Sequence, residues 1–237
     1  MLRIHFVCLT SLAMGVCTVA HSALPLDLTV RPLPQAYSDS CQSYGMALAA
    51  ASIPGSPLKA ANVKELRENE KAILRERDAI AKKERVDRLS HLVWPKALEA
   101  ASAGILTADI RYLKTEAEWR AEVQKLTGIS SPSTVRPTLG AMLVKTVVLT
   151  SVTALGKNTY PSHIIAVLGV ENKANGEVLV LNPAIKVGEG PEKLSCEIDD
   201  TPGDAKYKSY VSIENSYILK PFRNATEGFL VMTVRKK

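Results

Sequence analysis

The order of helix-forming and strand-forming segments along the chain constrains its fold more than any other feature. Helical patterns dominate the first half, which also holds one predicted strand at 108–114, and they cover residues 41–51, 62–92 and 116–126. The second half changes to β-forming runs at 144–155, 163–170, 177–181, 207–211, 216–219 and 228–234. Because both faces of the last run are mostly apolar, we expect that strand in the centre of a sheet. These patterns predict an α+β fold, in which an N-terminal helical half packs against a C-terminal antiparallel β-sheet.

The first 23 residues have the layout of a secretory signal peptide. Arg3 supplies a positive charge, residues 6–20 form an apolar run without charge, and Ala23 is a small residue at a plausible cleavage point. The apolar run is too short to span a membrane comfortably. We therefore expect residues 1–23 to be removed. Residues 24–237 should form one exported domain, periplasmic or secreted, with no stable membrane insertion.

Composition excludes several classes of protein but names no function. With 46% hydrophobic and 23% charged residues, the chain is unlike disordered, collagenous or coiled-coil proteins. Its net charge of +6 is spread along the chain, without the dense basic patch that a nucleic-acid partner requires. No metal-ligand spacing surrounds His91, which we interpret as structural. We predict no cofactor and no metal, and the sequence does not fix the oligomeric state.

The charged block at 62–92 predicts a long helix inserted into the domain. Its apolar residues Leu66, Ile73 and Ile80 recur every seven residues and make only a narrow stripe. The pattern indicates a largely solvated helix that packs along one thin edge. A lid or a partner-docking helix is the alternative interpretation.

Two cysteines remain once the signal peptide is removed, Cys41 and Cys196. In an oxidising compartment they would most simply form one disulfide. The residues around Cys41 favour another role, because the cluster of helix-capping residues at 38–40 places Cys41 in the first turn of a helix. Helix N-termini favour a negative charge and lower the pKa of a thiol, as a thiolate nucleophile requires. Both interpretations, nucleophile and disulfide, stay open at this point.

A predicted hairpin brings a histidine and an asparagine together. The turn at 171–176 places His163 opposite about residue 184 in antiparallel pairing, close to Asn182. The Asn182 oxygen could then orient the imidazole while its other nitrogen faces a thiol. Gln35 lies six residues before Cys41. Its amide and the Cys41 backbone N–H could together stabilise an oxyanion.

This arrangement resembles the papain-like cysteine peptidases. It is most similar to the compact bacterial peptidases related to bacteriocin leader-processing peptidases, over residues 35–51 and 144–184. The resemblance implies a papain-like fold with Cys41 as nucleophile, His163 as general base and acid, Asn182 as the orienting residue and Gln35 in the oxyanion hole. The chain departs from the family where Gln42 replaces the usual Gly. It departs again where Tyr44, or no residue, corresponds to the family's Trp.

What the resemblance implies is an exported cysteine protease that cleaves a peptide or amide bond through a thioester on Cys41. A cell-wall amidase is an alternative. Small papain-like cell-wall hydrolases more often have a second His where Asn182 stands, which favours a protein or peptide substrate. Export of a catalytic thiol would also suit a virulence factor that acts on host proteins. The remaining alternatives are an exported binding domain with a Cys41–Cys196 disulfide, and a degenerate papain-like fold that serves as an inhibitor or adaptor.

Overall fold

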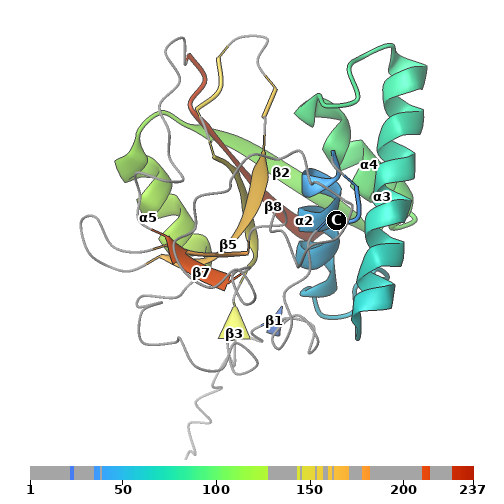
Figure 1. Cartoon of the computed structure of the whole chain (residues 1–237), viewed down its shortest axis with the longest axis horizontal. Helices are drawn as coiled ribbons and strands as arrows, with labels where there is room; N and C mark the ends of the chain where they lie inside the picture. The colour runs from blue at the N-terminus through green and yellow to red at the C-terminus, as the bar shows by residue number, and fades with distance from the viewer. Residues whose placement is uncertain are drawn as a thin grey trace, which may run out of the picture.

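The structure is a computed structural model, drawn in Figure 1. It describes residues 22–23, 35–37, 39–127, 143–144, 146–152, 154–156, 160–161, 163–170, 178–181, 210–213 and 226–237. The predicted strand at 216–219 lies outside these residues, as do Asn182 and Cys196.

The helices of the described residues all fall in the first 127 residues. They are α2 (Cys41–Ala51), α3 (Val63–Glu84), α4 (Trp94–Ala101) and α5 (Glu116–Thr127), with a short 3-10 turn η1 (His91–Val93) before α4. The prediction for α2 is confirmed at both ends. The predicted helix at 62–92 is too long, because the chain leaves α3 at Arg85, whose φ of 56° lies in the left-handed region that ends helices.

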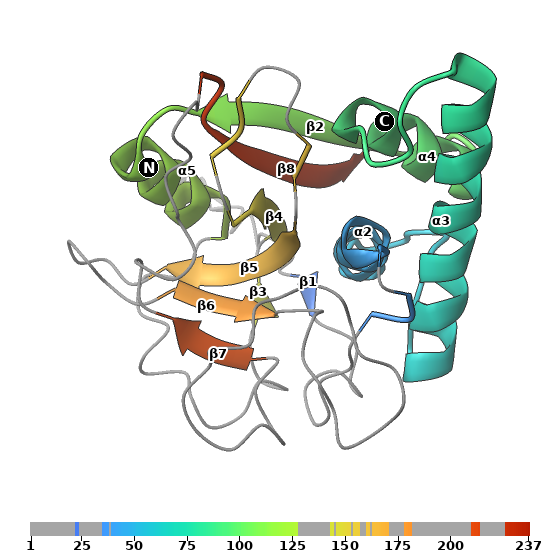
Figure 2. The same ribbon diagram turned by 45° about the horizontal axis from the view of Figure 1, so that its top comes forward.

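An antiparallel sheet makes up the other half of the fold. Its order is β2 (Leu106–Leu113), β8 (Phe229–Lys236), β4 (Val148–Ser151), β5 (Ile164–Val170), β6 (Val178–Leu181) and β7 (Tyr210–Ile213). Along the chain, β2 lies between α4 and α5, and the other strands of this sheet follow α5. Figure 2 shows this order from top to bottom. The last strand of the chain, β8, lies between β2 and β4, so its predicted central place is confirmed. The expected strand at 144–155 is divided, since β3 (Leu143–Val144) pairs instead with β1 (Ser22–Ala23).

Each face of the sheet packs against helices. One core cluster joins Leu149, Ala166 and Met232 on the strands to α2, α3 and α4. The alternate strand residues, such as Val148, face a second cluster under α5. Figure 1 shows α5 across the sheet from α2, α3 and α4. The α+β class is therefore confirmed. No helix in the described ranges combines the length and the hydropathy needed to cross a membrane.

Helix α2 lies in the centre of the molecule, and every residue from 41 to 50 is buried. It packs against α3 and against β4, β5 and β8. Small side chains make this close packing possible. At Gly45, an added Cβ would lie 2.8 Å from Leu149 Cδ2. The helix that carries Cys41 is thus held on all sides.

Candidate active site

A hydrogen-bonded turn leads directly into Cys41. The carbonyl oxygen of Tyr37 accepts bonds from Gln35 Nε2 at 2.6 Å, Ser40 Oγ at 2.9 Å and the Ser40 backbone N–H at 3.2 Å. Ser40 is the N-cap residue of α2, but its side chain makes no capping bond to the helix. Its hydroxyl instead forms hydrogen bonds with the backbone of Tyr37 in the turn.

Two charged residues of α3 bind this turn. Glu70 Oε1 accepts from the Ala36 backbone N–H at 2.8 Å and lies 2.6 Å from Ser40 Oγ, whose single proton is shared between Glu70 and Tyr37 O. Its other oxygen pairs with Arg67 at 2.9 Å. The Glu70 side chain is fully buried, so its hydrogen bonds must replace those it would make to water.

The second residue is Arg77, whose side chain is also fully buried. It donates to the Asp39 carbonyl oxygen at 2.8 Å and pairs with the Asp39 carboxylate at 3.1 Å. Arg88 contacts the same carboxylate at 2.9 Å. We name Glu70 and Arg77 the α3 clamp. Helix α3 is largely solvated and packs along one narrow face, as predicted, but two of the residues on that buried face are charged and hold the residues just before Cys41.

Sequence reasoning missed the α3 clamp, although a signal for it is present. Glu70 and Arg77 are seven residues apart, and each follows a core residue, Leu66 or Ile73, by four positions. Positions four apart share one face of a helix. Leu66 and Ile73 mark the buried face of the helix, and the spacing places Glu70 and Arg77 on that same face. From the sequence alone, we interpreted these charges as solvated.

Cys41 opens α2 as predicted, and it is a buried thiol, 6% exposed. Its Sγ–H donates to Oε1 of Gln42 at 3.3 Å. The first turn of a helix presents unpaired backbone N–H groups and favours a negative charge. The next residues are buried as well, and burial raises the pKa of the Tyr44 phenol, which stays protonated.

His163 lies immediately before β5 and is 3% exposed. Its carbonyl oxygen accepts from the Val152 backbone N–H at 3.4 Å. Figure 2 shows that β5 begins beside α2 and runs away from it, and the two elements are in contact. The structure thus places the predicted base at the start of the strand that packs against the helix of the predicted nucleophile.

The register of the predicted hairpin agrees with the structure over the strand residues described. Ala166 pairs with Leu181, and Val167 pairs with Val180. A bulge follows between Val167 and Gly169, on the turn side of these pairs. The predicted orienting residue Asn182 comes directly after β6 but lies outside the described residues, so its role stays a prediction.

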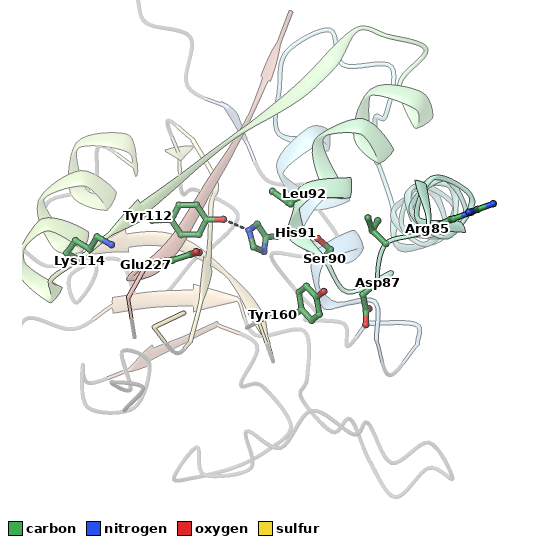
Figure 3. A pocket seen from close by; sticks show the side chains of 10 residues that line it. Arg85, Asp87, Ser90, His91, Leu92, Tyr112, Lys114, Tyr160 and Glu227 are labelled. Atoms are coloured by element: carbon green, nitrogen blue, oxygen red, sulfur yellow. Dashed lines mark hydrogen bonds between the residues drawn. The ribbon is translucent and has the colours of Figure 1, made fainter. Parts of the chain in front are cut away.

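A cavity of about 810 Å³ is lined mainly by the segment that follows α3, by β2 and by Tyr160, and its lining includes neither Cys41 nor His163. Its walls include Tyr160, three residues before His163, and Asp87, which precedes the Arg88 that contacts Asp39. Figure 3 shows the His91 ring between the two halves of the fold, hydrogen-bonded to the Tyr112 hydroxyl. Burial lowers the pKa of His91, while the nearby Glu227 carboxylate opposes this shift. In the described ranges, no group of three or more His, Cys, Asp and Glu side chains is placed to hold a metal ion.

A scan of protein-family models finds no match to this chain, and neither the curated proteins nor the solved structures give a match.

Proposed function

We propose that this chain is an exported papain-like cysteine peptidase in which Cys41 is the nucleophile and His163 the general base and acid. One observation carries the proposal. A buried thiol opens a central helix, and the strand packed against that helix is preceded directly by a buried histidine. Cysteine nucleophiles need an adjacent base and a site that favours the thiolate, and we assign these two roles to His163 and to the first turn of α2.

The reaction is acyl transfer. The Cys41 proton passes to His163, and the sulfur attacks the carbonyl carbon of a peptide bond. The C–N bond then breaks, and His163 returns the proton to the leaving nitrogen. Water then gives a proton to His163 and attacks the thioester carbon, the C–S bond breaks to release the acid, and His163 returns the proton to the Cys41 sulfur.

The turn before Cys41 supports the oxyanion part of this mechanism. A side-chain amide nitrogen carries two donors, and the 2.6 Å bond to Tyr37 O fixes the direction of the Gln35 amide. The second Gln35 N–H and the Cys41 backbone N–H are the proposed donors to the oxyanion. Such a hole works because its donors are held in place before charge develops. The α3 clamp holds this turn through buried charges.

The cavity that includes Tyr160 supports a peptide or protein substrate, although Cys41 and His163 do not line it. It joins aromatic and aliphatic side chains, including Tyr112, Tyr160 and Leu92, with charged groups at Arg85 and Glu227. Such a mixed lining suits an extended polypeptide, whose side chains differ in character. We propose that the substrate chain runs through this cavity, past Tyr160 towards His163.

Peptide cleavage tests this proposal. Purified protein is incubated with a degenerate peptide library, and new termini are located by mass spectrometry. We expect cleavage by the wild type and by Cys196→Ser, and none by Cys41→Ser or His163→Ala. If the wild type does not cleave, and Cys196→Ser and Cys41→Ser lower the stability equally, the disulfide-linked binding domain is supported instead.

A further inference from the structure

We propose that Gln42 is a further catalytic residue, whose side-chain amide donates a hydrogen bond to the Cys41 thiolate. This inference rests on the proposed function, since it assigns a partner to the proposed nucleophile. It concerns a position where this chain differs from the family that it resembles, because Gln42 replaces a Gly there. A side chain at this position can reach the sulfur, and a Gly has none to do so.

The geometry of the Gln42 amide carries the inference. Gln42 is 2% exposed, and its Oε1 lies 3.3 Å from Cys41 Sγ as the acceptor of the thiol proton. Its Nε2 is buried and has no hydrogen-bond partner among the residues that the structure describes. Buried amide groups in folded proteins nearly always have partners, so an unpaired one demands a physical reason. Here the unpaired donor belongs to the same small group that already touches the reacting sulfur.

The contact in the structure suits only the neutral thiol. When Cys41 loses its proton to His163, the S–H bond breaks, its electron pair stays on sulfur, and a ring nitrogen of His163 gains the N–H bond. Oε1 would then face an anion, which is unfavourable. Rotation about the last side-chain bond of Gln42 exchanges oxygen and nitrogen, and this torsion is broad and roughly two-fold.

After that rotation, Nε2 donates to the thiolate. Hydrogen bonds to a charged acceptor are stronger than those between neutral groups, so the amide stabilises the thiolate more than the thiol. Gln42 therefore lowers the pKa of Cys41 and raises the fraction of nucleophile. Gln35 has a separate task, since its Nε2 is directed at Tyr37 O.

Other charges act on Cys41 as well, but they are the same in every variant proposed below. Asp39 and Arg88 belong to neighbouring loops. The charged and titratable groups of the elements that pack against α2 include Arg67, Glu70 and Arg77 on α3, Lys96 and Glu99 on α4, His163 before β5, and Arg235 and Lys236 on β8. A change confined to the Gln42 amide therefore isolates its own effect.

The test measures the pKa of the Cys41 thiol in wild type and in Gln42→Met. The pKa is obtained from the ultraviolet absorbance of the thiolate as a function of pH. A Cys41→Ser variant supplies the blank that removes the signal of Cys196. Met fills similar space without a donor. We expect the thiol pKa to rise by about one unit, which means about tenfold less thiolate at a pH below it. Gln124→Met on α5, the same change far from the site, should leave the pKa unchanged.

A pKa that is unchanged in Gln42→Met, or lower, overturns the inference. A lower value would mean that Oε1 only holds the neutral thiol. Should Gln42→Met fail to fold by circular dichroism, Gln42→Leu carries the same expectation and the same contradiction. The wild-type value is a separate test: a pKa at or above the ordinary ~8.5 counts against Cys41 as the nucleophile, whatever the variants do.

Discussion

Helices α2 and α3 pack against each other but bury different kinds of side chain. Small and apolar residues dominate the buried surface of α2, whose residues 41–50 are covered on all sides. Helix α3 exposes one face to solvent and buries two charges, Glu70 and Arg77, on the other. Both charges bind the turn before Cys41. Apolar packing therefore fixes the helix that carries the thiol, whereas buried charge fixes the turn that leads into it.

The largest expected loss of stability comes from removing one of the two buried charges of the α3 clamp. In Arg77→Met, the Asp39 carbonyl and carboxylate lose a fully buried partner, and Arg88 remains as a half-exposed one. Removing one member of a fully buried ion pair costs about 3–5 kcal/mol. Here the carboxylates that pair with Arg77 are partly exposed, Asp39 to 25% and Asp78 to 46%, so we expect a smaller loss of about 2–3 kcal/mol in the free energy of unfolding, measured by chemical denaturation.

The matched control is Arg75→Met on the outer face of α3. Its side chain is 77% exposed and pairs only with its neighbour Glu76 among the described residues. Exposed pairs of this kind contribute about 0–1 kcal/mol, so the stability should barely change. Equal losses in Arg75→Met and Arg77→Met would show that α3 contributes through charge in general and not through the clamp.

A smaller loss of stability is expected when the apolar packing of α2 is disturbed by Gly45→Ala. The new Cβ would lie 2.8 Å from Leu149 Cδ2, at the end of a side chain that can shift. Overpacking costs about 1–3 kcal/mol, and the better helix propensity of Ala returns up to about 1 kcal/mol. We expect a net loss of about 1 kcal/mol in the free energy of unfolding.

The double variant Gly45→Ala with Leu149→Ala checks the cause of that loss. Truncating Leu149 removes the clashing methyl groups, so Gly45→Ala should then be neutral or stabilising relative to Leu149→Ala alone. An unchanged penalty in this background would mean that the contact with Leu149 is not its source.

The smallest effect depends on pH and concerns His91, in the segment that joins α3 to α4. Burial lowers the pKa of His91 below its ordinary value of about 6.5. The unfolded chain then binds more protons than the folded one, so stability falls as the pH drops through about 6.5. In thermal melts between about pH 8 and pH 5, His91→Gln should lose less stability than the wild type. A parallel loss in both proteins would contradict this assignment.

Much of the fold could be predicted because local patterns decide it. Both ends of α2, the central place of β8 and the pairing of Ala166 with Leu181 follow from composition, alternation and the position of a turn. The end of α3 could not be predicted, since no Gly or Pro marks it and Arg85 adopts the left-handed conformation without either. The division of the segment 144–155 depends on which strands pair across the sheet, which no local pattern records.

The candidate site shows the same limit. Cys41 and His163 were expected at the starts of a helix and a strand, and the structure places them there. The α3 clamp was missed because the charges of the block 62–92 were interpreted as solvated, and the Gln42 contact was missed because no local pattern shows which side chain touches the Cys41 sulfur. Only the three-dimensional packing reveals that Glu70, Arg77 and Gln42 are buried.

The most direct test of the central claim is alkylation of Cys41 by iodoacetamide at about pH 6, well below the ordinary thiol pKa of ~8.5. Mass spectrometry locates the label in the wild type and in His163→Ala. We expect rapid labelling of Cys41 in the wild type that disappears in His163→Ala, as a histidine-activated thiolate requires. A Cys41–Cys196 disulfide, or a Cys41 that stays unlabelled in both proteins, would contradict the proposal that this chain is a cysteine peptidase.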